Sequence, residues 1–351
     1  MPISSPRVRY WPPPSAPQES GSISAVQKSL IINQMTSKKE KIKVGISSCL
    51  IGEKVRYDGG HKLDRFITNT LGCYFEWIPV CPEVECGLPV PREAMHLAGI
   101  PEVQRLITIK SNIDHTEKMR PWIKKKLQEL EREELCGFVF KSKSPSSGIS
   151  GVKIHHPAEN RIRTGSGLFG GAFMKHFPLL PVVDDGRLHN DRFRVNFVEG
   201  VFVYKRWREF LKQGASIRNL VDFHTDHKLL LMAHSPKHYI HLGRLVARAK
   251  EIKRAELFAE YIRNLMDGVR LMATARKNTN VLHHILGYFK KRLSSDEKQE
   301  LQEVIDNYQQ KLTPLIVPVT LIKHYVRKFD ITYLRRQYYL NLHPIKLILS
   351  S

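Results

Sequence analysis

The chain has 351 residues, of which 42% are hydrophobic, so it is long enough to form two domains with buried cores. Lysine and arginine number 56 against 34 aspartate and glutamate residues, which gives a formal net charge of +22. No apolar run is long enough to cross a bilayer and the N-terminus lacks the pattern of a secretory signal, so we expect a cytoplasmic protein without a membrane partner.

The first half of the chain predicts a disordered extension followed by an α/β domain. Residues 1–41 are rich in proline and serine and show no periodicity, which is typical of disorder. Short apolar runs then predict buried strands at residues 42–46, 74–80, 136–140 and 178–183. Amphipathic helices are expected at residues 116–135 and 191–211. Because strands and helices alternate, we predict a Rossmann-like α/β domain with a mainly parallel sheet over residues 42–214.

Strand signals disappear after this domain, and the second half predicts an all-α domain over residues 215–351. Ser235 followed by Pro236 has the pattern of a helix start, and Ser294 or Ser295 can cap a later helix. The helices are expected at residues 237–254, 255–275, 281–292, 295–311 and 315–328.

The positive charge is concentrated in this helical half. Residues 205–351 contain 27 basic and 13 acidic side chains. An excess of that size attracts polyanions, and it favours a nucleic-acid partner over a merely solvated surface, although nothing indicates specificity for DNA.

Three polar turns follow three of the predicted strands. Cys49 comes after the first strand, Cys81 and Glu83 after the second, and the serine-rich loop 144–148 after the third. Ligands of parallel sheets bind outside the carboxyl ends of the strands, so we expect these turns to meet at one edge.

The cysteines leave two interpretations open. There are five, an odd number, and a disulfide framework is not expected in a protein of this size and compartment. Thiolates are soft metal ligands, but isolated cysteines also pack as small apolar residues. The spacing of Cys49 and Cys81 does not decide between these roles. Glu83 favours a site, because a carboxylate beside a metal or a nucleophile is a candidate general base.

Four long motifs resemble known families. The segments CLIGEKVRYDGG (residues 49–60), VCPEVECGLPVPRE (80–93) and FKSKSPSSG (140–148) resemble the TudS-like thiouracil desulfidase family. The segment FHTDHKLLLMAHSPKHYIHLGRLVA (223–247) resembles the YbgA-type helical domain. The combination is similar to tRNA 4-thiouridine desulfidases of the RudS type, and the resemblance covers about residues 42–345.

The resemblance implies a hydrolase that uses a 4Fe–4S cluster with one open iron, which takes the sulfur of a thiocarbonyl without net redox change. It makes Cys49 and Cys81 cluster ligands, Glu83 the acid and base, and Ser146 the hydroxyl that assists proton transfer or orients the base. The third ligand position holds Ser147, where the family has cysteine. Three outcomes are open: the Ser147 hydroxyl binds the cluster, a neighbouring thiol replaces it, or no stable cluster forms.

The leading hypothesis is therefore a desulfidase-family protein that acts on thiolated uracil, with 4-thiouridine in tRNA or a free thiolated nucleobase as substrate. The alternative is a cluster-less, catalytically impaired RNA-binding or interaction protein, which Ser147 favours. A small-molecule thiouracil enzyme, whose helical domain serves only assembly, is a third possibility.

Four weaker patterns have alternative interpretations. Residues 56–60 predict a polar turn that either borders the substrate or is structural, and the glycines of 165–171 are interpreted as a loop rather than a phosphate cradle. His224, His227 and His234 are interpreted as structural rather than as metal ligands. The tyrosines and basic residues of 325–339 suit either RNA contacts or a core between solvated charges.

Overall fold

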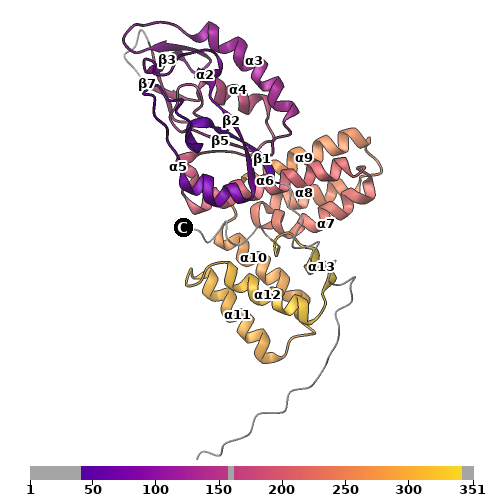
Figure 1. Cartoon of the computed structure of the whole chain (residues 1–351). Helices are drawn as coiled ribbons and strands as arrows, with labels where there is room; N and C mark the ends of the chain where they lie inside the picture. Colours follow the sequence, from indigo (N-terminus) through magenta and orange to yellow (C-terminus); the bar gives the residue numbers. More distant parts are fainter. Residues whose placement is uncertain (1–40, 157–161, 342–351) are drawn as a thin grey trace, which may run out of the picture. The chain divides into compact units, whose positions relative to one another are not determined.

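The computed structural model describes residues 41–156 and 162–341 (Figure 1). The extension predicted over residues 1–41 lies outside this range except for its last residue.

A four-stranded parallel sheet occupies the centre of the first domain, as expected. Its strands, in spatial order, are β2 (Phe75–Val80), β1 (Ile42–Ser47), β5 (Phe138–Phe140) and β8 (Val182–Asp184). The pairing of β1 with β2 runs from Ile42 opposite Phe75 to Ser47 opposite Val80. The sheet order places the ends of the first three strands side by side.

Helices cover both faces of this sheet because its strand residues alternate in direction. Phe138 and Phe140 belong to a buried cluster with residues of α3 (Thr116–Arg132) and α4 (Leu168–His176). Val139, between them, belongs to a second cluster with residues of α6 (Asp191–Lys212). The helical spacing of apolar residues in α3 matches the prediction, since Met119, Ile123, Leu127 and Leu130 are all buried.

A second sheet was not predicted. Its spatial order is β4 (Val103–Thr108), β3 (Met95–Ile100), β6 (Val152–His155) and β7 (Ile162–Gly165). β3 and β6 pair in parallel and the two outer pairs are antiparallel. The loop interpretation of residues 165–171 holds only for Ser166 and Gly167, because Gly165 ends β7 and Gly170 lies inside α4.

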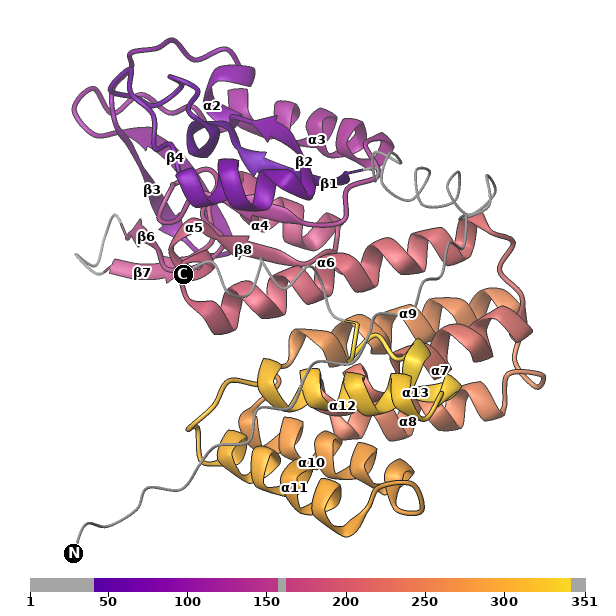
Figure 2. The ribbon, with the colours of Figure 1, turned by 60° about the horizontal axis from the view of Figure 1, so that its bottom comes forward.

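The second half is helical, as predicted (Figure 2). The helices are α7 (Ile217–His234), α8 (Pro236–Ala247), α9 (Arg254–Arg270), α10 (Ala275–Leu286), α11 (Ser295–Gln309), α12 (Ile316–Lys328) and α13 (Thr332–Arg336). Ser294 caps α11 in a reciprocal arrangement with Glu297, and Ser235 caps α8. No helix in the described ranges has both the length and the apolar character needed to span a membrane.

Helix α6 contributes to two hydrophobic cores. Phe197, Val198 and Val201 pack in the cluster beneath the parallel sheet. Trp207 and Phe210, further along, pack among residues of the following helices. The domain boundary at residue 214 stays a prediction, and a cut there would expose the Trp207 side of α6 to water.

The three histidines singled out in α7 are buried and hydrogen-bonded. His224 pairs through Nδ1 with the Tyr261 hydroxyl at 3.1 Å, and His227 donates from Nδ1 to the Phe223 carbonyl at 2.7 Å. His234 lies 2.9 Å from a Glu199 carboxylate oxygen. Among the described residues no group of three histidine, cysteine or acidic side chains is arranged for a metal ion.

The run of tyrosines and basic residues near the C-terminus is partly core. Tyr325 and Tyr339 are buried, so they cannot stack on a base from solvent. Lys328 pairs with Glu297, and Arg336 is held by two aspartates of α7. The core interpretation therefore holds for these side chains.

Candidate functional site

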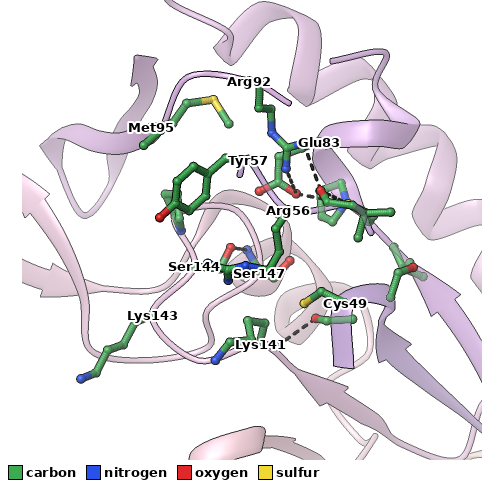
Figure 3. A pocket seen from close by; sticks show the side chains of 18 of the residues that line it. Cys49, Arg56, Tyr57, Glu83, Arg92, Met95, Lys141, Lys143, Ser144 and Ser147 are labelled. Atoms are coloured by element: carbon green, nitrogen blue, oxygen red, sulfur yellow. Dashed lines mark hydrogen bonds and ion pairs between the residues drawn. The ribbon is translucent and has the colours of Figure 1, made fainter. Parts of the chain in front are cut away.

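The three turns predicted to meet do lie together, around a cavity of about 290 Å³ (Figure 3). β1 leads into the short helix η1 (Ser48–Ile51), which carries Cys49. β2 leads into Cys81 and then α2 (Pro82–Glu85), which carries Glu83. The loop after β5 carries Ser146 and Ser147.

A hydrogen bond joins two of the turns beside this cavity. Ser146 donates from Oγ to Glu83 Oε1 at 2.6 Å, and both side chains are buried. The other Glu83 oxygen lies 3.7 Å from the Cys81 sulfur and 4.0 Å from an Arg92 nitrogen. A buried carboxylate costs free energy unless it is paired, and here a hydroxyl, a thiol and a guanidinium surround it.

Helix α4 holds the serine loop in place from behind. The backbone N–H groups of Phe169 and Gly170 both donate to the Ser146 carbonyl, at 2.8 and 3.0 Å. The loop and the helix approach so closely that a Cβ on Gly167 would lie 2.5 Å from that carbonyl oxygen. Glycine is therefore required at position 167 by close approach of two backbones rather than by a special turn.

The two pocket thiols are buried and uncharged in this environment. Burial raises the pKa of Cys49 to about 11, although Lys141 and Arg56 oppose the shift. Burial and the neighbouring Glu83 carboxylate raise the pKa of Cys81 to about 12. Free thiols in such surroundings are protonated at neutral pH, and each would become a thiolate only on binding a metal.

Several cations line the same pocket, and the sequence motifs gave no sign of their roles. Lys141 is held by the Asp185 carboxylate at 2.7 Å. Burial disfavours the charge on Asp185, but the hydrogen bonds from Lys141 and Ser142 lower its pKa below the ordinary value. Arg92 donates to the Val55 carbonyl at 3.0 Å. Arg92 and Lys141 belong to the family-like segments 80–93 and 140–148, but only the fold shows that they line the same pocket as the thiols.

The polar turn of residues 56–60 borders the cavity, which agrees with the interpretation that it lies beside a substrate. Arg56 and Tyr57 line the pocket, and the Arg56 guanidinium lies 5.3 Å from the centre of the Tyr57 ring. Tyr57 remains 45% exposed, so part of its side chain is accessible to a ligand.

The remaining cysteines do not supply a third pocket thiol. Cys86 donates from its sulfur to the Glu83 carbonyl and packs in the cluster of α3 and α4. Cys136 precedes β5, at the end of that strand away from the serine loop, and packs among α6 residues. Neither lines the pocket, whereas Ser147 does. This arrangement does not support the outcome in which a neighbouring thiol replaces the third ligand.

The donors present do not fit a 4Fe–4S cluster that is held by three thiolates. Cys49 and Cys81 are suitable soft ligands at two positions. Ser147 offers a hydroxyl, a hard and weakly acidic donor, and its oxygen lies 3.4 Å from that of Ser146. The roles predicted for these residues stay predictions.

Two family descriptions match consecutive parts of the chain. Residues 44–185 match the family described as 2-thiouracil desulfurase. Residues 228–344 match the family described as DUF1722, a protein of unknown function.

Two proteins are similar to parts of the chain. YbgA of Escherichia coli strain K12, named an uncharacterized protein, is 30% identical over 154 residues, which are 44% of this chain and 91% of YbgA. A solved structure of the [4Fe-4S]-dependent thiouracil desulfidase TudS has 27% sequence identity to this chain. The match covers 42% of this chain and 94% of the TudS chain. The TM-score between the two structures is 0.34.

Proposed function

This chain belongs to the YbgA family and joins a TudS-like domain to a YbgA-type domain, and we propose that it desulfidates 4-thiouridine in tRNA. The 2-thiouracil desulfurase match supports a thiolated uracil as the reacting group. The observation that carries the proposal is a pocket lined by two thiols and by Glu83, whose carboxylate accepts a buried hydrogen bond from Ser146.

The pocket suits one base rather than a larger ligand. Its volume of about 290 Å³ lies just below the roughly 300–1,000 Å³ usual for small-molecule sites. Tyr57 offers a ring on which a pyrimidine can stack, and Met95 adds an apolar contact from β3. A nucleotide of RNA must leave its stack to enter such a pocket.

The reaction balances as a hydrolysis. Glu83 takes a proton from a water molecule whose oxygen attacks the thiocarbonyl carbon. The attack moves the π electrons of the thiocarbonyl onto sulfur, which takes up the proton that Glu83 holds. The carbon–sulfur bond then breaks with its electron pair on the departing hydrosulfide ion, while the added hydroxyl group becomes the new carbonyl. The hydroxyl proton passes through Glu83 to the hydrosulfide, which leaves as hydrogen sulfide. Ser146 donates to the carboxylate and fixes its orientation toward the water. One water is consumed, uridine is formed, and nothing is oxidised or reduced.

The cations of the pocket favour negative charge on the departing sulfur. Lys141 and Arg56 both act to lower the pKa of Cys49, so the electrostatic potential at that sulfur is made more positive by them. A thiocarbonyl sulfur that lies beside Cys49 would experience the same stabilisation as it gains charge in the transition state.

A tRNA substrate is supported by charge. The chain carries a net charge of +22, and a free nucleobase would not require it. Arg56, Arg92, Lys141 and Lys143 line the reaction pocket itself, so a phosphate-bearing strand meets positive charge close to the reacting base.

The proposal is tested by incubating the purified full chain with 4-thiouridine and with thiolated tRNA in water enriched in oxygen-18. We expect release of sulfide, loss of the thiocarbonyl absorbance, and one heavy oxygen in each uridine formed. Glu83→Gln should slow all three by about 10²–10⁴-fold. Turnover without heavy oxygen in the product would contradict hydrolysis.

Ser147 supports a second candidate function. Without a third thiol, a protein of this ancestry would retain recognition of thiolated RNA but lack turnover. Tight binding of thiolated tRNA with no sulfide release, before and after anaerobic treatment with iron and sulfide, would establish this binding function and contradict the desulfidase proposal.

A further inference from the structure

A second hollow adjoins the reaction pocket. Ser142 and Lys143 line both the pocket and this hollow, which has a volume of about 490 Å³. Its far side is formed by Arg187 of α5 (Asp185–Leu188) and by Phe193 at the start of α6. Figure 3 shows Lys143 at the margin of the pocket, with its amino group directed away from Cys49 and Glu83.

The second hollow contains an exposed aromatic side chain with an arginine over it. Phe193 is 41% exposed, and the Arg187 guanidinium lies 5.7 Å from the centre of its ring. The same arrangement occurs at the reaction pocket, where Arg56 lies over Tyr57. Exposed aromatic rings beside cations are the usual platform for stacking successive bases of a single strand.

The charges of the hollow favour a phosphate. Lys143 is exposed and makes no ion pair with any residue in the described ranges. Arg187 is anchored by Asp184, which lies 3.5 Å from its Nε and accepts a hydrogen bond from its backbone N–H. This contact fixes the guanidinium over the Phe193 ring and offsets part of the positive charge, so Lys143 is the better phosphate partner.

We propose that the second hollow is a nucleotide subsite: the base next to the thiolated uridine of an RNA strand stacks on Phe193, and the phosphate between the two nucleotides contacts Lys143. The inference rests on the proposed function, because it takes the thiolated base to occupy the reaction pocket. Lys143 lines both cavities, which is where a phosphate linking two bound nucleosides must lie.

The test compares two probes on the full chain: the free nucleoside 4-thiouridine, and a short single-stranded RNA that contains one 4-thiouridine. Phe193→Ala should weaken binding of the RNA about tenfold, in line with the loss of one stacked base. Its affinity for the nucleoside should stay within twofold of the unchanged chain. Leu211→Ala, on the same helix and 45% exposed, is the matched control for loss of surface apolar area.

Lys143→Ala is expected to make RNA binding less dependent on salt concentration. One lost phosphate contact lowers the slope of log affinity against log salt by about 0.7 for a single strand. Lys124→Ala, an exposed lysine on α3, is the charge-matched control and should leave the slope unchanged. Phe193→Ala should leave the slope unchanged as well, because stacking releases no counterions.

The outcomes separate this subsite from the proposed function. Sulfide release from the nucleoside, together with RNA affinity that Phe193→Ala and Lys143→Ala leave within twofold, overturns the subsite and leaves the proposed function standing. Equal loss of nucleoside and RNA affinity in Phe193→Ala overturns the subsite too, since the ring would then serve the reaction pocket. Failure of the unaltered chain to bind or desulfidate either probe overturns both.

Discussion

Ser146 and Glu83 are separated by 63 positions in the chain, and yet the serine hydroxyl donates to the glutamate carboxylate at 2.6 Å. The fold brings them together because β2 and β5 flank β1 in one parallel sheet, so the segments after them leave at the same edge. The contact is buried on both sides, which makes its geometry independent of solvent.

Replacement of Glu83 should separate chemistry from binding. Glu83→Gln keeps the size of the side chain but removes the base, so we expect the rate of sulfide release to fall by about 10²–10⁴-fold. Ser146→Ala should lower the rate by about tenfold, since one hydrogen bond that orients the carboxylate is lost. Equilibrium binding of 4-thiouridine, measured by calorimetry, should change little in both variants.

Glu93→Gln is the control for this pair, because Glu93 lies in the same segment but binds the Lys110–Ser111 turn instead of the pocket. A Glu83→Gln variant that retains at least half of the rate would show that another group activates the water.

Restoration of a thiol at position 147 should change the iron content. The unaltered chain offers Cys49, Cys81 and a hydroxyl, so we expect less than one 4Fe–4S cluster per chain after anaerobic reconstitution. Ser147→Cys should bind about one cluster and develop the broad visible absorbance of iron–sulfur proteins. Ser144→Cys, in the same loop, is the control for adding a thiol nearby. Equal iron in the unaltered chain and in Ser147→Cys would show that the serine is an adequate ligand.

The parallel sheet and the meeting of the three turns were predictable because the strands that carry them are short, apolar and followed at once by polar turns. In β1 five of the six residues are buried, and a strand buried on both faces has a nearly continuous apolar sequence. Such a run differs from the spaced apolar residues of a surface helix. Each turn directly follows a strand, so all three turns could be placed at the carboxyl edge of the sheet without knowing the spatial order of the strands.

The second sheet escaped prediction for a physical reason. In β4 the buried positions are Gln104, Leu106 and Thr108, so two of the three inward side chains are polar and the apolar alternation is hidden. In β7 no residue is fully buried. The cations around the thiols escaped for another reason: Lys141 and Arg92 converge only through tertiary contacts.

Helix boundaries were least predictable where the first turn is polar. Helix α10 begins at Ala275, six residues before the expected start, because Thr274 caps it and accepts a hydrogen bond from the Lys277 backbone. Its first turn contains Arg276 and Lys277, which give no apolar signal. The start of α11 was predictable because Ser294 and Glu297 form a capping box with a recognisable sequence.

Gly167→Ala should damage the site from outside the pocket. Its Cβ would lie 2.5 Å from the Ser146 carbonyl oxygen, so the loop must move away from Glu83 or the start of α4 must shift. We expect a loss of about 1–3 kcal/mol in the free energy of unfolding, typical of overpacking, and a fall in the rate of sulfide release. Gly287→Ala, where nothing lies within 4 Å of the added Cβ, is the control and should be neutral or slightly stabilising. Unchanged stability and rate in Gly167→Ala would contradict the close approach.

The contribution of the three buried α7 histidines to the free energy of unfolding should be greatest near the ordinary histidine pKa of about 6.5. Burial lowers the pKa of His224 to about 4 and of His227 to about 3, so the unfolded chain binds more protons than the folded chain in acid. Stability is therefore lost as the pH falls below 6.5, by up to about 1.4 kcal/mol per pH unit for each histidine.

His234 changes the stability with pH in the opposite direction to His224 and His227. Burial disfavours its charged form, but the Glu199 carboxylate and the Leu271 carbonyl raise its pKa above the ordinary value. Its contribution to stability is complete below pH 6.5 and is lost as the pH rises through the raised pKa. The free energy of unfolding is measured with denaturant from pH 4.5 to 9. In His227→Gln its slope against pH should be smaller on the acid side, because about one proton fewer is taken up on unfolding. In His234→Gln the slope should be smaller on the alkaline side. Identical slopes in the unaltered chain and both variants would show that these buried histidines titrate alike in the folded and unfolded states.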